Sequence, residues 1–251
     1  MIKMLMFDLK RTEKEFLKTY DTSDFEITYF ENNLNKNTKL TLKECDETSI
    51  ISVFITSDIC AEVLNKFKNL RIVVTRSVCF KHIDIEECRR RNIAVINVND
   101  YAREAISQYV IGLTFTMSRN ILTANNDMKK QTNNYEKYES ENISKLSIGV
   151  IGTGSVGSAV CELAHKLNMK IYAYDFVKNK NISDYTEYVS FNNLLRKSDI
   201  ITLHIPYHKE LEKMISDKEF EIMKAGSYLI NTCEYKLVDS FALYKALNKN
   251  K

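Results

Sequence analysis

The chain has 251 residues, of which 44% are apolar and 27% charged, and its 36 Lys and Arg against 33 Asp and Glu give a net charge of +3. This length and composition support one large or two ordinary domains and exclude a disordered or fibrous protein. Both signs of charge are interspersed, no apolar run could span a bilayer, and no signal-peptide pattern precedes the first apolar segment. We therefore expect a cytoplasmic protein that binds neither nucleic acid nor membrane.

The first hundred residues alternate short apolar strands with helical stretches. Strands are predicted at residues 4–7, 25–29, 50–55, 72–74 and 94–98, and helices near 14–20, 61–67 and 85–91. Such alternation is typical of a parallel α/β layer.

An amphipathic helix is predicted next, over residues 103–126, and a polar stretch at 129–144 is interpreted as a surface link or short helix. After it, strands are predicted at 148–151, 170–174, 200–204 and 228–231. Helices are expected after the first of these strands and near 191–197, 217–223 and 240–247. The second half of the chain is therefore a second α/β layer.

A G-x-G-x-x-G pattern stands between the strand at 148–151 and the helix that follows it. Gly152 permits a tight turn, Gly154 lets a pyrophosphate approach the backbone, and Gly157 lets the helix pack close to the strand. The free N–H groups at the helix N-terminus then face the phosphates. The pattern predicts a dinucleotide site, with a glycine-rich turn that only packs strand against helix as the alternative.

The acidic residue that completes such a site is Asp175. It ends the strand at 170–174, 18 residues after Gly157, where an acid binds the ribose hydroxyls. Because a carboxylate repels a 2′-phosphate, NAD is predicted in preference to NADP.

The cysteines and histidines do not form a metal-binding pattern. The six cysteines include no C-x-x-C pair, so we expect reduced thiols. His204 and His208 are four residues apart, but Pro206 lies between them at the end of a strand, which excludes a helical His pair. No metal is predicted.

Several segments together resemble the D-isomer-specific 2-hydroxyacid dehydrogenases, which include D-lactate and 2-hydroxyisocaproate dehydrogenases. The segments are the run Thr-Arg-Ser-Val-Cys-Phe-Lys-His-Ile-Asp at 75–84, Asn-Val-Asn-Asp-Tyr at 97–101, the glycine fingerprint with Asp175, Ser-Asp-Ile-Ile-Thr-Leu-His-Ile-Pro at 198–206, and the stretch 214–232 followed by Leu-Val-Asp at 237–239. The resemblance covers nearly the whole chain.

The resemblance implies an NAD-dependent oxidoreductase that transfers hydride between NAD(H) and a 2-oxo or D-2-hydroxy acid. It implies a flavodoxin-like substrate domain over 1–100, a hinge and dimerisation arm over 101–145 that makes a homodimer, and a doubly wound Rossmann NAD-binding domain over 146–251 that is incomplete at its C-terminus. Ser155, Val156, His204, Ile205, Pro206, Thr232 and Cys233 would join the three glycines and Asp175 at the cofactor. Val78, Cys79 and Tyr101 would border the substrate, although Tyr101 also suits an ordinary hinge aromatic.

The expected catalytic residues are where the sequence departs from the family. Members carry an arginine that binds the substrate carboxylate, and Glu234 occupies its position here. The acid–base histidine of the family and the Glu that orients it come from segments after Leu-Val-Asp that these residues do not include. We therefore expect a C-terminally truncated, weakly active or inactive relative.

Three functions remain open from the sequence. The chain is a fragment or copy of an active dehydrogenase, a catalytically inactive NAD(H)-binding sensor, or an interaction protein in which NAD stabilises a dimer.

Overall fold

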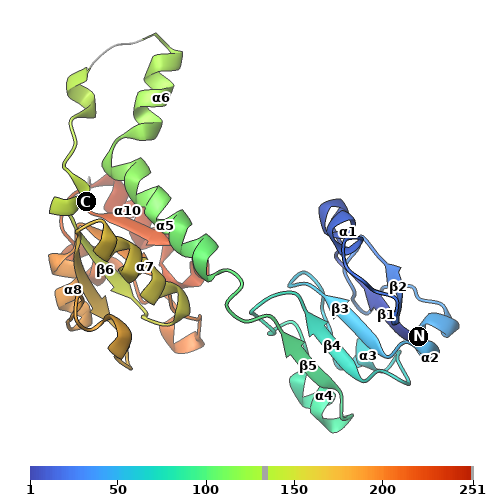
Figure 1. Cartoon of the computed structure of the whole chain (residues 1–251). Coiled ribbons are helices and arrows are strands. Elements are labelled where there is room, and N and C mark those ends of the chain that lie inside the picture. The colour runs from blue at the N-terminus through green and yellow to red at the C-terminus, as the bar shows by residue number, and fades with distance from the viewer. Residues whose placement is uncertain (132–134, 250–251) are drawn as a thin grey trace. The chain divides into compact units, whose positions relative to one another are not determined.

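The computed structural model describes residues 1–131 and 135–249, and the chain divides into two compact units, Met1–Tyr101 and Ala102–Lys251 (Figure 1). Each unit has its own five-stranded parallel sheet and its own apolar core.

The first unit has the strand order β2-β1-β3-β4-β5, which is the flavodoxin-like order. The strands are β1 (Ile2–Met6), β2 (Phe25–Tyr29), β3 (Ile50–Val53), β4 (Ile72–Thr75) and β5 (Ala94–Asn97). The helices are α1 (Arg11–Leu17), α2 (Leu42–Glu47), α3 (Ala61–Leu64) and α4 (Ile85–Arg90).

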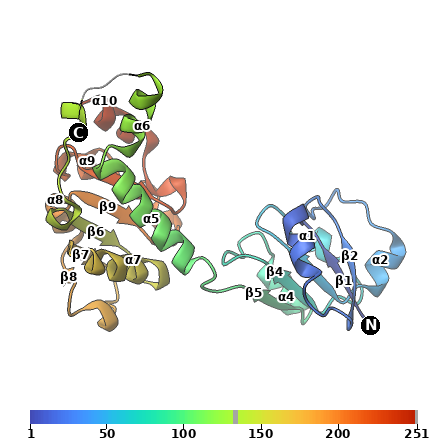
Figure 2. The same cartoon turned by 45° about the horizontal axis from the view of Figure 1, so that its top comes forward.

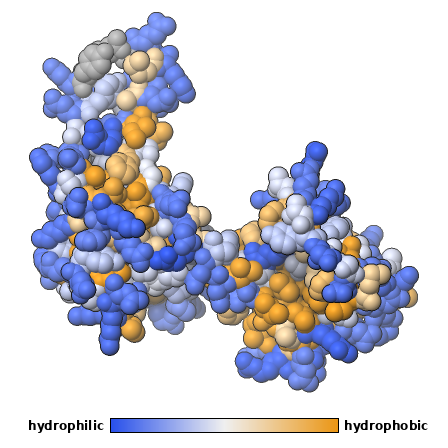
Figure 3. All heavy atoms as spheres, in the orientation of Figure 1, coloured by the Kyte–Doolittle hydropathy of each residue, from blue (hydrophilic) through white to orange (hydrophobic). Residues whose placement is uncertain are grey.

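One face of this sheet carries the core of the first unit. Leu5 and Ile51 point from neighbouring strands toward Val63 and Leu64 of α3, and all four are buried. The alternation of side chains along a strand places the other residues on the opposite face. Apolar side chains reach the surface of this unit (Figure 3), and Ile96 of β5 is 48% exposed.

The second unit has the strand order β10-β9-β6-β7-β8. Its strands are β6 (Ser147–Ile151), β7 (Lys170–Tyr174), β8 (Glu187–Tyr188), β9 (Ile200–Leu203) and β10 (Tyr228–Asn231). Its α-helices are α5 (Arg103–Ser118), α6 (Ile121–Lys129), α7 (Ser155–Lys166), α8 (Phe191–Lys197), α9 (Asp217–Ile222) and α10 (Ser240–Asn248). Short 3₁₀ turns are η1 (Tyr135–Tyr138), η2 (Ile143–Lys145), η3 (Lys180–Ile182), η4 (Lys209–Leu211) and η5 (Tyr235–Leu237).

Helices cover both faces of this second sheet, as a doubly wound Rossmann fold requires. α5 and α7 pack side by side on one face (Figure 2), where Val110 and Val160 are buried with Ile148. α8, α9 and α10 contribute to the core of the other face. The predicted α/β fold with a flavodoxin-like sheet and a Rossmann sheet is thus confirmed.

Several predicted elements have shifted ends: the helix predicted near 14–20 is α1, the strand at 50–55 is β3 and the helix near 61–67 is α3. Three further differences concern whole elements. The single helix predicted over 103–126 is two helices, because Asn120 adopts a left-handed backbone conformation with φ 51° between α5 and α6. The helix α2 was not predicted, although Thr41 and Glu44 form its capping box. The strand β8 was not predicted because it has only two residues.

The stretch at 129–144, predicted as a link or short helix, contains η1 and part of η2, while residues 132–134 lie outside the described residues. Within the described ranges, none of the helices is both long and apolar enough to cross a membrane.

Candidate functional site

The predicted dinucleotide loop lies at the carboxyl end of β6. From β6 the strand order continues through β7 to β8 at one edge of the sheet. On its other flank β6 pairs with β9, so the strand order reverses direction at β6. This is the topological switch point at which open α/β sheets bind ligands. The loop leads directly into α7, a helix of 12 residues that begins at Ser155.

The three glycines of the loop differ in what a side chain would meet. A Cβ at Gly157 would lie 1.9 Å from the carbonyl oxygen of Gly152, and Gly152 itself has φ +92°. A Cβ at Gly154 would meet nothing within 4 Å. The fold therefore requires Gly152 and Gly157, whereas the open space beside Gly154 suits a ligand that approaches the backbone.

The first turn of α7 carries the N–H groups that such a ligand would use. The peptide N–H groups of Ser155, Val156 and Gly157 precede the first intrahelical hydrogen bonds. Arg103 donates from Nε to the carbonyl of Ser155 over 3.2 Å and from Nη2 to Glu162 over 3.2 Å. This arginine ties the start of α5 to the start and middle of α7, which fixes the helix N-terminus.

Asp175 follows β7 and is hydrogen bonded to the glycine loop. Its Oδ2 accepts from the peptide N–H of Thr153 over 2.6 Å and from the Thr153 hydroxyl over 3.0 Å, and Oδ1 accepts from the peptide N–H of Val177 over 3.3 Å. Burial alone would raise the pKa of Asp175, but these hydrogen bonds outweigh it and hold the pKa below its usual value. The carboxylate is therefore ionised at neutral pH.

The segment 204–206 lies against the other side of the loop. A Cβ on Gly152 would lie 2.4 Å from the carbonyl oxygen of His204 and 2.6 Å from Cγ2 of Ile205. The His204 Nε2 lies 2.9 Å from the hydroxyl of Thr202, and burial lowers its pKa to about 4. The imidazole is thus neutral at physiological pH. Pro206, two residues further on, is exposed.

Thr232 and Cys233 follow β10, and both are half-buried. The Cys233 Sγ donates to the carbonyl of Leu203 over 3.1 Å, and burial raises the pKa of its thiol. Glu234 comes next and is exposed. Its backbone carbonyl accepts from Asn231 Nδ2 over 3.3 Å, so the backbone is held while the carboxylate faces solvent.

The predicted substrate residues belong to the first unit. Val78 is 48% exposed and Tyr101 is 57% exposed. The carbonyl of Val78 accepts from Asn97 Nδ2 over 3.0 Å, and that of Cys79 accepts from the Ser77 hydroxyl over 2.6 Å. Side chains therefore hold both carbonyl groups of this segment.

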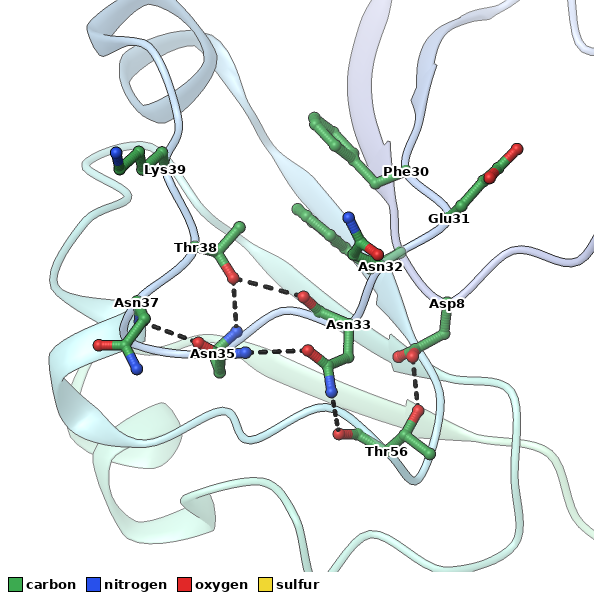
Figure 4. A pocket seen from close by; sticks show the side chains of 11 residues that line it. Asp8, Phe30, Glu31, Asn32, Asn33, Asn35, Asn37, Thr38, Lys39 and Thr56 are labelled. Atoms are coloured by element: carbon green, nitrogen blue, oxygen red, sulfur yellow. Dashed lines mark hydrogen bonds between the residues drawn. The ribbon is translucent and has the colours of Figure 1, made fainter.

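A separate hollow of about 680 Å³ lies beyond β1 and β2 (Figure 4). Asn33 Nδ2 donates to the carbonyl of Thr56, Asn35 Nδ2 donates to Asn33 Oδ1, and the Thr38 hydroxyl donates to the carbonyl of Asn33. The polar groups thus bind one another and shape the loop after β2. None of the predicted site residues lines this hollow.

The four histidines all lie in the described part of the chain, His82 in the first unit and the other three in the second. His82 lies 3.2 Å from the Thr75 hydroxyl in the first unit, and His165 stacks on Tyr185 with ring centres 4.2 Å apart. His204 is neutral, and His208 precedes η4. Among the described residues, no group of three acidic, His or Cys side chains could hold a metal ion.

Three residues of the site were not predicted from the sequence. They are Thr153, which lies inside the glycine fingerprint, and Asn179 and Tyr188, which reach it by hydrogen bonds. Of these three residues, only Thr153 lies within a sequence motif. Its hydrogen bonds to Asp175 form because β6 and β7 are neighbouring strands.

Comparison with known proteins gives one consistent result. A family model for the NAD-binding domain of D-isomer specific 2-hydroxyacid dehydrogenases matches residues 111–251. The chain is 28% identical to a 2-hydroxyacid dehydrogenase homolog of Haemophilus influenzae over all of this chain and 76% of the relative. It is 34% identical to a D-specific alpha-keto acid dehydrogenase of Enterococcus faecium over 80% of this chain and 62% of the relative.

Among solved structures, D-lactate dehydrogenase from Aquifex aeolicus complexed with NAD and lactic acid superposes with a TM-score of 0.86 at 30% identity, over 99% of this chain and 74% of that chain. The alignments thus span between 62% and 76% of the length of these three relatives.

Proposed function

Since this chain belongs to the D-isomer specific 2-hydroxyacid dehydrogenase family, we propose that its second unit binds NAD(H) at the carboxyl end of β6. The observation that carries this proposal is the open backbone at Gly154 beside the ionised carboxylate of Asp175. The N–H groups of Ser155, Val156 and Gly157 would hold the pyrophosphate, and Asp175 would hold the ribose hydroxyls. His204, Ile205, Pro206, Thr232 and Cys233 would line the nucleotide.

The reaction of the family is hydride transfer between NAD(H) and a 2-oxo or D-2-hydroxy acid, with a D-lactate-like substrate here. NAD(H), when bound, supplies the hydride donor or acceptor. Val78, Cys79 and Tyr101 would border the substrate. For these residues we propose cofactor binding without turnover, because Glu234 presents a carboxylate where the resemblance implies an arginine, and because His204 beside the glycine loop is neutral and so has no imidazolium proton to donate.

The alternative is that the protein works as an NAD(H)-binding sensor or interaction module. The same cofactor site supports this alternative, because a sensor or interaction module needs to bind NAD(H) but does not need to catalyse a reaction.

The cofactor proposal is tested by titrating the chain with NADH and NADPH. We expect at least about tenfold tighter binding of NADH, equivalent to about 1.4 kcal/mol, because the carboxylate of Asp175 repels a 2′-phosphate. The variant Asp175→Ala should bind NADH more weakly and lose most of this preference. Equal affinity of the wild-type chain for the two cofactors would remove the basis of the assignment.

We also propose that the chain is organised as a substrate domain over 1–100, an arm over 101–145 and an NAD-binding domain over 146–251. The arm would form a homodimer. In its support, Leu122 and Met128 of α6 are 62% and 63% exposed, and exposed apolar side chains on one helix favour association.

Dimer formation is checked by sedimentation velocity. The double variant Leu122→Glu and Met128→Glu should shift the chain toward a monomer, because charges on the helix oppose burial of that surface. The variant Leu247→Glu, at an equally exposed position on α10, serves as the matched control and should leave the mass unchanged. A wild-type chain that is monomeric throughout would refute the dimer.

A cytoplasmic location is proposed as well. It is supported by the six cysteines, which are all free thiols, since reducing compartments keep thiols in this state.

A further inference from the structure

Thr153 connects the glycine loop to the acidic residue of the site through two hydrogen bonds on one oxygen. Its peptide N–H and its hydroxyl both donate to Oδ2 of Asp175, over 2.6 Å and 3.0 Å. Thr153 as a whole residue is only 2% exposed, so water does not compete for these bonds. This N–H group is therefore committed to the carboxylate and is not available to a phosphate.

Tyr188 extends this network from the edge strand β8. Its hydroxyl donates to Thr153 Oγ1 over 3.0 Å and accepts from the peptide N–H of Asn179 over 2.9 Å. The side chain of Asn179 also donates to the carbonyl of Thr153 over 3.2 Å. Lys178 Nζ lies 5.7 Å from the centre of the Tyr188 ring, which adds a cation–π contact that holds the ring in place.

The series of hydrogen bonds from the peptide N–H of Asn179 to the carboxylate of Asp175 can have only one direction. A peptide N–H can only donate and an ionised carboxylate can only accept. The hydroxyl protons of Tyr188 and Thr153 must therefore both point toward Asp175. A chain of bonds oriented in one direction polarises each member and strengthens the last bond, which is the one on the carboxylate.

The network leaves Asp175 with one oxygen for a ligand. Oδ2 receives two bonds from Thr153, whereas Oδ1 receives the longer 3.3 Å bond from Val177. A carboxylate whose orientation is set before binding loses less conformational freedom when it accepts a ribose diol. The same fixed charge repels a 2′-phosphate more strongly than a carboxylate that can rotate away.

We propose that Thr153 and Tyr188 are positioning residues, which fix the Asp175 carboxylate and thereby set the preference of this site for NAD(H) over NADP(H). The inference rests on the proposed assignment of Asp175 to the ribose.

The test compares the dissociation constants of NADH and NADPH for Tyr188→Phe, Thr153→Ala and Thr153→Ser. Tyr188→Phe removes only the hydroxyl and should weaken NADH binding about threefold to tenfold, the effect of one net hydrogen bond, without weakening NADPH binding. Thr153→Ala should have a larger effect in the same direction. Thr153→Ser keeps the hydroxyl and should stay close to the wild type.

Tyr185→Phe is the matched control, because Tyr185 stacks on His165 on the same unit and is not part of the network. It should leave both affinities unchanged. If the melting curve shows that Thr153→Ala does not fold, the positioning role is tested by the NADH and NADPH affinities of Tyr188→Phe alone.

Asp175→Ala separates the two proposals. If it lowers the NADH-over-NADPH ratio while Tyr188→Phe and Thr153→Ala leave that ratio at the wild-type value, the positioning role is overturned and the cofactor assignment stands. If Asp175→Ala itself leaves the ratio unchanged, the assignment of Asp175 fails and the positioning role fails with it.

Discussion

Replacing Glu234 by arginine is expected to tighten binding of a 2-oxo acid to the NADH-loaded chain by about tenfold or more, without producing turnover. Two like charges about 4 Å apart at an effective dielectric near 20 repel by roughly 4 kcal/mol. Because Glu234 is exposed, solvent reduces this repulsion, and a bidentate guanidinium then adds attraction. Turnover still requires a proton donor, which the substitution does not supply.

The measurement is a titration with pyruvate or 2-oxoisocaproate followed by quenching of bound NADH fluorescence. Glu234→Gln should give an intermediate gain, because it removes the repulsion without adding the guanidinium. Glu210→Arg places the same charge change at another exposed position of the second unit, and should have little effect. An unchanged affinity in Glu234→Arg would show that this residue does not face the substrate carboxylate.

The second large effect is expected from two glycines that lie three residues apart. Gly157→Ala should destabilise the chain by at least about 2 kcal/mol, because its Cβ would collide with the backbone oxygen of Gly152 at 1.9 Å. Gly154→Ala should leave stability nearly unchanged, since its Cβ would meet open space. It should nevertheless weaken NADH binding at least about tenfold, because that space is where the pyrophosphate approaches.

Thermal melting and NADH titration of the two variants give the readout. The expected pattern is a lowered melting temperature for Gly157→Ala and weak cofactor binding at normal stability for Gly154→Ala. A Gly154→Ala chain that binds NADH like the wild type would place the phosphates elsewhere.

Most of the fold was predictable because strand and helix patterns in this chain are local. Parallel strands such as β6 and β9 are buried along their whole length and are mostly apolar, and the helices between them have clear periodicity. The break at Asn120 was not predictable, because apolar residues continue in helical spacing on both sides of it. The left-handed conformation of one asparagine decides that the helix ends there.

The cofactor site was only partly predictable. The glycines and Asp175 stand in a motif whose spacing reflects backbone geometry, so the sequence alone indicates them. Tyr188 could not be found in this way, because it lies on a two-residue strand and reaches the site only through the pairing of β7 with β8. Its hydrogen bond depends on tertiary packing, for which the sequence carries no local signal.

The central claim is that these residues bind NAD(H) but do not use it to reduce a 2-oxo acid. It is tested most directly by measuring cofactor binding and cofactor oxidation in the same sample. The wild-type chain is mixed with an equal amount of NADH and an excess of pyruvate, and nicotinamide fluorescence and absorbance are recorded together. The account predicts a fluorescence change that reports binding and an absorbance that stays constant. A steady loss of the absorbance of reduced nicotinamide, above that of NADH and pyruvate without protein, would contradict it.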